Sequence, residues 1–371
     1  MGAVRDERID MEYRGEAMAE KLRIAVVGAG YWGPNLARNF STSADWELVA
    51  ICDLDRERAD GLATRVGRVE VYTDLAELLA RDDLDAIAIA TPARTHHPIV
   101  LAGLRAGKHV LVEKPLADTR ERGLEMVEEA ATRGLVLMAD HTYCYTPAVL
   151  KIRELIADGQ LGDILFIDSV RINLGLIQPD VDVLWDLAPH DLSIIDFVLP
   201  DGLRPKSVSA HGADPLGAGR ACVGYLTIPL DKGAIAHVHV NWLSPTKIRR
   251  MVIGGTERTL VWDDLNPQQR LSVYDRGVDL AQQSVDTVDR RSSTISYRLG
   301  DTWSPALPEH EALGAMAVEF AASISGGRAP RTDGQAGLRV LSVLEAASRS
   351  LADSGNSASV ETAAIQAEVV R

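Results

Sequence analysis

The chain has 371 residues, of which 46% are hydrophobic and 25% are charged, and its formal net charge is −14. This composition is typical of a globular protein long enough for two domains, and the negative charge argues against nucleic acid or an anionic membrane as a partner. No apolar stretch approaches the ~20 residues of a membrane-spanning helix, and three scattered cysteines are too few for a disulfide framework or a zinc cluster. The sequence therefore predicts a cytoplasmic protein without a metal site.

Residues 1–21 are predicted to form a flexible N-terminal extension. They are mixed in charge and lack the basic-then-apolar plan of a signal peptide. Met11 and Met18 are alternative starts, so this segment is left out of the fold prediction.

The next segment predicts a dinucleotide-binding turn. The apolar run Ile24–Val27 leads into a GxGxxG pattern, and amphipathic residues follow, which is the order of strand, tight turn and helix. Gly28 permits the turn, Gly30 lets the backbone approach a pyrophosphate, and Gly33 lets the helix pack close to its strand. A second apolar run ends at Asp53, where a carboxylate that binds the adenosine ribose is expected. The predicted cofactor is NAD, with NADP possible.

Short apolar runs alternate with helical patterns throughout residues 22–145. Apolar strands separated by helices indicate a parallel sheet covered on both faces. We therefore predict an α/β chain whose first domain is a doubly wound Rossmann domain, followed by a second domain at 146–371.

The second domain is predicted to be α+β. Its strands, between 164 and 274, mostly follow one another without helices, which indicates a large, mainly antiparallel open sheet. Helices are expected at 184–199, 309–325 and 334–350, whereas 277–305 is polar and is expected to be irregular. Because an uncovered sheet face often serves as a subunit interface, a homodimer or homotetramer is expected.

A lysine follows the strand His109–Glu113, in the motif Glu113-Lys114-Pro115. The carboxyl end of a parallel strand faces the crevice where such sheets bind ligands. This motif, the glycine turn and Thr91-Pro92 with His96 together resemble the glucose–fructose oxidoreductase/inositol dehydrogenase (Gfo/Idh/MocA) family. In that family the lysine stands beside the nicotinamide and the reacting hydroxyl.

Asp186 and His190 form the second constellation, because residues four apart share one helix face. A carboxylate that orients an imidazole makes a general acid/base, although the two residues alone are equally compatible with a structural helix pair. The surrounding segment resembles the nucleotide-sugar C3 dehydrogenases of the same family, and Lys114, Asp186 and His190 match their catalytic positions.

The resemblance implies hydride transfer between a nicotinamide and a sugar hydroxyl or ketone, with C3 of a nucleotide-activated sugar as the expected position. The expected cofactor-binding residues are Gly28, Gly30, Tyr31, Trp32, Gly33, Asp53, Thr91, Pro92, His96, Glu113 and Lys114. The expected substrate-binding residues are Lys114, Arg171, Asn173, Asp186, His190, Lys247 and Arg298. Three alternatives remain open: a 3-ketoreductase of deoxysugar biosynthesis, a dehydrogenase of inositols, free sugars or sugar phosphates, and a non-catalytic NAD-binding regulator.

Overall fold

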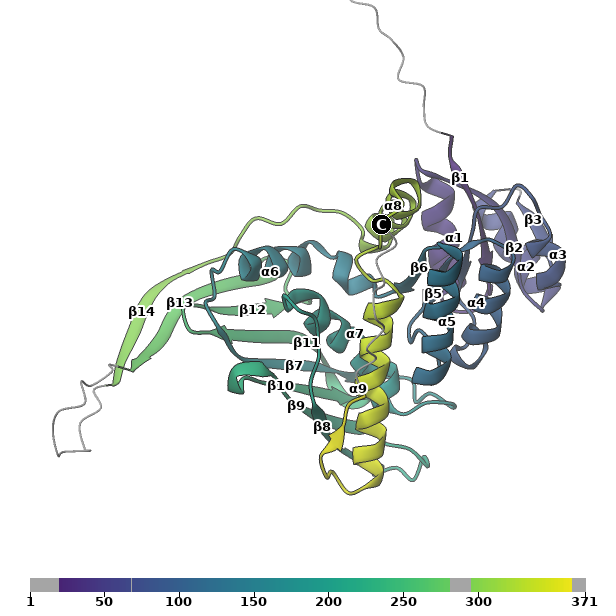
Figure 1. Ribbon diagram of the computed structural model, residues 1–371. Helices are drawn as coiled ribbons and strands as arrows, with labels where there is room; N and C mark the ends of the chain where they lie inside the picture. Colours follow the sequence, from purple (N-terminus) through teal and green to yellow (C-terminus); the bar gives the residue numbers. More distant parts are fainter. Residues whose placement is uncertain (1–19, 68, 281–294, 362–371) are drawn as a thin grey trace, which may run out of the picture.

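The computed structural model describes residues 20–67, 69–280 and 295–361. Nearly all of the N-terminal extension predicted at 1–21 therefore lies outside the described residues. Within them the chain forms a six-stranded sheet and a nine-stranded sheet, which lie at opposite sides of Figure 1 with helix α9 between them.

The six-stranded sheet carries the predicted dinucleotide fold. Its strands are β1 (Leu22–Val27), β2 (Trp46–Cys52), β3 (Glu70–Tyr72), β4 (Ala86–Ile89), β5 (His109–Glu113) and β6 (Leu137–Asp140). They lie in the order β3-β2-β1-β4-β5-β6 and every pair is parallel, which is the doubly wound order of dinucleotide-binding sheets. All four residues of β4 are buried, as expected for a central strand covered on both faces.

Helices connect these strands and cover both faces of the sheet. They are α1 (Gly33–Thr42), α2 (Arg56–Val66), α3 (Leu75–Leu79), α4 (His96–Arg105) and α5 (Arg120–Arg133), with short 3₁₀ turns at Ala93–Thr95 and Thr142–Tyr145. Helix α1 buries Leu36 and Phe40, whereas α2 begins where the side chain of Asp55 accepts a hydrogen bond from the Arg58 backbone N–H.

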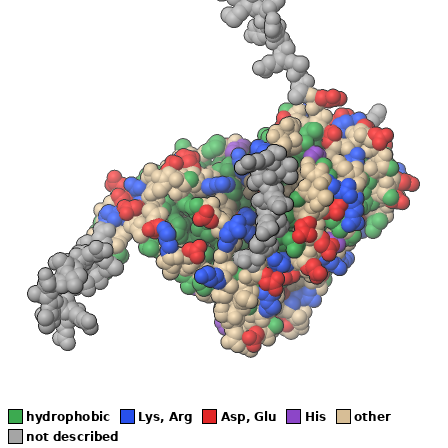
Figure 2. Space-filling view, in the orientation of Figure 1, with side chains coloured by type: hydrophobic (Ala, Val, Ile, Leu, Met, Phe, Trp, Pro, Cys, Tyr) green, Lys and Arg blue, Asp and Glu red, His purple; other side chains and the backbone are tan. Residues whose placement is uncertain are grey.

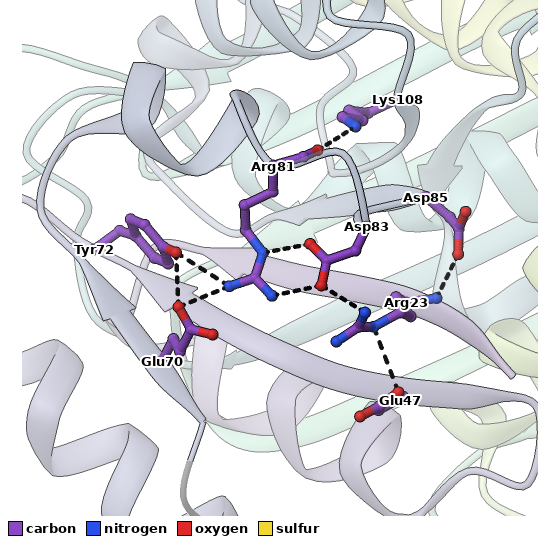
Figure 3. A network of polar contacts seen from close by, with 8 residues as sticks. All are labelled: Arg23, Glu47, Glu70, Tyr72, Arg81, Asp83, Asp85 and Lys108. Atoms are coloured by element: carbon purple, nitrogen blue, oxygen red, sulfur yellow. Dashed lines mark hydrogen bonds and ion pairs between the residues drawn. The ribbon is translucent and has the colours of Figure 1, made fainter.

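The edge of this sheet at the amino ends of its strands is held by a polar network (Figure 3). Arg81 contacts Asp83, Glu70 and the hydroxyl of Tyr72, and Asp83 also pairs with Arg23 at 2.5 Å. The Arg81 side chain is only 13% exposed, so its charge needs these partners. The network ties β1 and β3 to the loops at the end opposite the ligand-binding crevice.

The nine-stranded sheet is mixed but mostly antiparallel, as predicted. Its elements and the flanking helices are α6 (Pro147–Ala157), β7 (Ile164–Leu174), α7 (Val183–Val198), β8 (Ser207–Ala213), β9 (Val223–Pro229), β10 (Ile235–Asn241), β11 (Leu243–Gly255), β12 (Thr259–Asp263), β13 (Leu271–Leu280), β14 (Ile295–Trp303), α8 (Ala312–Gly326), α9 (Gly334–Ala352) and β15 (Ala358–Ser359). The strand order is β14-β13-β12-β11-β7-β10-β9-β8-β15, with β7 and β10 parallel.

The prediction that 277–305 is irregular was wrong for its described part. Strand β13 continues to Leu280 and pairs with β14, from Val273 opposite Trp303 to Leu280 opposite Ile295. The reason is that backbone hydrogen bonds between two neighbouring strands can hold a hairpin whose sequence carries little hydrophobic alternation.

One face of the larger sheet is covered and the other is open. Along β10 the residues Ala236, Val238 and Val240 are buried, whereas Ile235 and His237, which alternate with them, are exposed. Helix α7 packs against β7, β9 and β10, and α9 packs against β8. This alternation is that of a sheet with one covered face.

The two C-terminal helices pack against the first domain. The Trp46 ring stacks on Phe320 of α8 with centroids 5.2 Å apart, and its Nε1 donates to the carbonyl of Ala317 at 2.8 Å. Just before α9, Thr332 accepts a hydrogen bond from the Ala139 backbone at the end of β6. The terminal helices therefore join the two sheets.

In the described ranges no helix is long and apolar enough to cross a membrane. Figure 2 shows acidic and basic side chains interspersed over the visible face of the molecule.

Candidate active site

A pocket of about 670 Å³ opens at the carboxyl ends of the parallel strands, between the two sheets. The first domain supplies residues from the turns after β1, β2, β4, β5 and β6, and the second supplies residues from α7, β11 and the segment after β7. Ligands of doubly wound sheets bind at this position.

The glycine turn has the geometry of a pyrophosphate cradle. A Cβ atom at Gly33 would lie 2.0 Å from the carbonyl oxygen of Gly28, and one at Gly28, where φ is 102°, would lie 2.8 Å from the Ala90 backbone. A Cβ at Gly30 would meet nothing within 4 Å, so the turn is open on the pocket side. Helix α1 begins without a side-chain cap, which leaves backbone N–H groups for an anion. These residues fit NAD.

Asp53 lines the pocket directly after β2. Its Oδ2 accepts a hydrogen bond from the Ala29 backbone at 2.6 Å, and Oδ1 accepts one from Asp55 at 2.8 Å. From the sequence, Arg56 is the cation expected to soften the preference for NAD. The structure instead places Arg58 in the pocket, whereas Arg56 pairs with Asp60 on the surface, because the first turn of α2 rotates successive side chains to different faces.

Replacing Asp53 with Ala is expected to weaken NAD binding more than NADP binding. A ribose hydroxyl loses a charged acceptor, which typically raises Kd by about ten- to a hundredfold, whereas the repulsion of a 2′-phosphate is relieved. Titration of both cofactors by fluorescence measures the change, and Asp60→Ala is the surface control. Tighter binding of NADP than of NAD by the unmodified protein would overturn the assignment.

Tyr31, Trp32, Thr91, Pro92 and Glu113 line the pocket, as expected of cofactor-binding residues.

His96 does not line the pocket. Its ring is fully buried and its two nitrogens contact the carbonyl oxygens of Pro115 and Thr91 at 2.9 and 2.8 Å. The expectation that His96 binds the cofactor is therefore corrected. This side chain joins the loop after β4 to the loop after β5, since a ring held by two backbone groups has no nitrogen left for a ligand.

Lys114 follows β5, at a cis peptide bond to Pro115, and it reaches α7 of the second domain. Its Nζ donates to the backbone oxygen of Asp186 at 3.1 Å and lies 3.5 Å from the Asp186 carboxylate. The other carboxylate oxygen accepts a hydrogen bond from Trp242 Nε1 at 3.0 Å. The expectation that Asp186 orients His190 is therefore corrected: in this structure Asp186 orients Lys114.

His190 lines the pocket one helical turn further along α7. Its ring packs edge-on against the Tyr143 ring, with the two ring centres 5.3 Å apart. The Nδ1 atom of His190 is buried without a hydrogen-bond partner. Burial, followed by the positive charges of Lys114 and Arg171, holds the pKa of His190 well below its ordinary value. The imidazole is therefore neutral at pH 7 and can accept a proton.

Four expected substrate residues do not line the pocket. Arg171 is 3% exposed and makes a bidentate contact with Asp191 of α7 at 2.7 and 3.1 Å, so it fixes the helix behind the site. Asn173 is on β7 beside Gly175, Lys247 lies in a separate surface hollow, and Arg298 pairs with Asp275 of β13. These four side chains lie outside the pocket, which the spacing of charged residues in the sequence does not reveal.

Other residues line the pocket that are not among the expected site residues. Tyr143 and Arg249 line the pocket, and the Arg249 guanidinium lies 5.9 Å from the Tyr143 ring centre and 3.6 Å from Asp264. Asp140 and Asp180 also line it. The position of Asp140 at the end of a predicted parallel strand is the signal that could have found it.

No cluster of three or more metal-binding side chains occurs in the part of the chain that the structure describes.

A doubly wound sheet with a glycine turn, an acid at the end of β2 and a lysine at the carboxyl end of β5 is typical of a dinucleotide-dependent oxidoreductase. The family model for the NAD-binding Rossmann fold of the oxidoreductase family matches residues 22–141, and the model for the GFO/IDH/MocA C-terminal domain matches residues 149–261. The chain therefore belongs to the Gfo/Idh/MocA family and is an NAD-dependent oxidoreductase.

Several relatives are enzymes that oxidise sugars. The chain is 28% identical to the UDP-N-acetylglucosamine 3-dehydrogenase of Acidithiobacillus ferrooxidans over 323 residues, which cover 86% of this chain and 94% of that protein. It is 32% identical to the D-glucoside 3-dehydrogenase of Escherichia coli K12 over 214 residues, which cover 54% of this chain but only 60% of that protein. The structure of GenD2 from gentamicin A biosynthesis, in complex with NAD, superposes with a TM-score of 0.75 at 26% identity and covers 94% of this chain and 99% of that one.

Proposed function

We propose that the protein transfers hydride between NAD and C3 of a sugar, and that the sugar is linked to a nucleotide. One observation carries the proposal. Lys114 contacts Asp186 of α7, and both Lys114 and His190 line the same pocket as the glycine turn. The full-length similarity to a UDP-N-acetylglucosamine 3-dehydrogenase supports the nucleotide-linked substrate.

Two side chains of the protein would act on the sugar hydroxyl: His190 on its proton and Lys114 on the negative charge that develops on its oxygen. His190 is neutral and lines the pocket, so its ring accepts the proton of the sugar hydroxyl in the oxidative direction. The Lys114 ammonium, held by Asp186, stabilises the alkoxide charge that develops on the same oxygen. NAD, which the glycine turn and Asp53 would hold, would supply the acceptor for the hydride of the sugar carbon. In the reductive direction the same groups return the proton to a ketone.

Arg249 is the residue best placed to contact a diphosphate. It lines the pocket from β11 of the second domain, whereas Lys247 and Arg298, also expected to bind substrate, do not. A guanidinium donates to phosphate oxygens through parallel charge-assisted hydrogen bonds.

Replacing Arg249 with Met should raise KM for a nucleotide sugar about ten- to a hundredfold, because one charge-assisted contact to phosphate is lost. KM for a free sugar should stay nearly unchanged. Steady-state NADH formation with UDP-N-acetylglucosamine, glucose and methyl glucoside measures both values. Arg204→Met is the control, because this arginine is exposed outside the pocket, in the segment before β8.

A glycoside or free sugar is the second candidate, favoured by the 32% identity to a D-glucoside 3-dehydrogenase. Equal kcat/KM for a sugar and its nucleotide diphosphate derivative would establish this candidate and reject the nucleotide-linked one.

We propose further that the open face of the nine-stranded sheet is the interface of a homodimer or of a tetramer built from dimers. On this face Val170 lies between His239 of β10 and Arg250 of β11. Replacing Val170 with Asp should shift the protein to monomers, since burying one unpaired charge typically costs several kcal/mol. Light scattering at micromolar concentration measures the mass. Val318→Asp, at an exposed position on α8, is the control; a monomer in the unmodified protein would contradict the proposal.

A further inference from the structure

Two acidic side chains, Glu113 and Asp140, lie next to each other at the floor of the pocket. They are the last residues of β5 and β6, the strand register pairs them directly, and both line the pocket. Glu113 is 9% exposed and Asp140 is 1% exposed. Two neighbouring buried carboxyl groups cannot both ionise without donors to stabilise both charges.

The donors are distributed unequally between the two acids. Asp140 accepts hydrogen bonds from Trp32 Nε1 at 3.1 Å and from the Thr142 hydroxyl at 2.5 Å. Glu113 accepts one from the Lys114 backbone N–H at 3.1 Å, and its Oε1 is buried without a partner. Asp140 therefore has two hydrogen-bond donors, whereas Glu113 has one donor and one oxygen without a partner.

The groups around the pair also affect whether Glu113 ionises. Burial and the charge of Asp140 raise the pKa of Glu113 well above its ordinary value. The Lys114 ammonium opposes this effect, but it is paired with Asp186 of α7. His141, which follows Asp140, is fully buried, and burial lowers its pKa to about 4, so it carries no charge at pH 7.

We propose that Glu113 and Asp140 share one proton in the cofactor-free protein, and that the positively charged oxidised nicotinamide expels this proton whereas the reduced cofactor does not. With its adenosine half bound at Asp53 after β2, the cofactor would extend its nicotinamide half toward β4, β5 and β6. A positive charge within ~4–6 Å of a carboxyl group lowers its proton affinity about 10- to 1000-fold. The proton passes to solvent, and no covalent bond to the cofactor forms or breaks. The inference rests on NAD binding and not on the identity of the sugar.

Calorimetric titration of the full-length protein at pH 7, in phosphate and in Tris, measures the protons released per cofactor bound. NAD⁺ should release up to about one proton more than NADH, because only the oxidised ring adds a positive charge. The ratio of Kd for NADH to Kd for NAD⁺ should also rise with pH, by up to about tenfold per unit, since proton release favours NAD⁺ at higher pH. Equal proton release with the two forms, or a ratio independent of pH, overturns the proposal.

Two variants test whether the proton released on NAD⁺ binding comes from Glu113 and Asp140. Glu113→Gln keeps a donor toward Asp140 and cannot ionise, and Asp140→Asn supplies an N–H that stabilises an ionised Glu113. Both should bind NADH while losing the extra proton release with NAD⁺. Asp180→Asn, at an exposed acid of the same pocket, should keep it. Persistence of the release in Glu113→Gln overturns the proposal, and the pH dependence of the unmodified protein tests it even if a variant fails to fold.

Discussion

Replacing Lys114 with Met should lower kcat about 100- to 1000-fold and leave NAD binding nearly intact. Loss of a charged donor at a developing alkoxide typically costs ~2.7–4 kcal/mol of transition-state stabilisation. The ammonium lies at the α7 side of the pocket, 3.5 Å from the Asp186 carboxylate, whereas the glycine turn would hold the phosphates of bound NAD. Met keeps much of the length of Lys, so the packing is retained. Single-turnover kinetics and NAD titration measure the two effects separately.

Lys151→Met on α6 is the control for this experiment. That lysine pairs with Glu154 on the surface, away from the pocket, so its loss should change neither quantity. A Lys114→Met protein that turns over at the normal rate, or one whose main defect is in NAD affinity, would remove Lys114 from the proposed chemistry.

Replacing His190 with Asn should lower kcat by about 100- to 10,000-fold, the usual contribution of a positioned general base. It should also change the pH profile. Because burial lowers the pKa of His190, oxidation by the unmodified enzyme should fall with acid only below the ordinary histidine value of 6.5, where the ring becomes protonated. The variant should lack this acid limb. Rates of NADH formation between about pH 4.5 and 9 test the prediction.

Two other substitutions distinguish the effect of His190 from the effects of other residues. His97→Asn alters a ring that pairs with Glu125 outside the pocket, so the rate and its acid limb should stay unchanged. Asp186→Asn should lower kcat less than His190→Asn and keep the acid limb, because Asp186 holds Lys114 and not the imidazole. An acid limb that survives in His190→Asn would assign the base to another group.

The cofactor half of the pocket could be predicted from the sequence more fully than the substrate half. The glycines and Asp53 act through backbone geometry and strand ends, which local sequence specifies, and each lies at or beside the predicted turn. The substrate side depends on where along each strand the pocket opens, and on β11 the register with β7 shifts between Leu243 and Ile248, next to Lys247. Arg249 lines the pocket and Lys247 does not, although both are cations on β11, so charge alone could not distinguish them.

His96 and Arg171 illustrate the same limit. Both are polar residues on elements next to the site, and sequence alone assigns them to ligands. In the structure His96 joins two loops and Arg171 anchors α7 through Asp191. A buried polar side chain must find partners, and whether these are protein groups or a ligand is decided by the packing of distant segments.

The sequence by itself determined the doubly wound sheet, the glycine turn, the placing of Lys114 at the end of β5 and the family resemblance. These features follow from hydrophobic periodicity and from backbone conformations that few residues adopt. Only the tertiary structure decided that Asp186 pairs with Lys114, that Glu113 lies against Asp140, and that β13 and β14 form a hairpin. Each of these contacts joins residues from different elements, and its geometry depends on how helices and strands distant in sequence pack together.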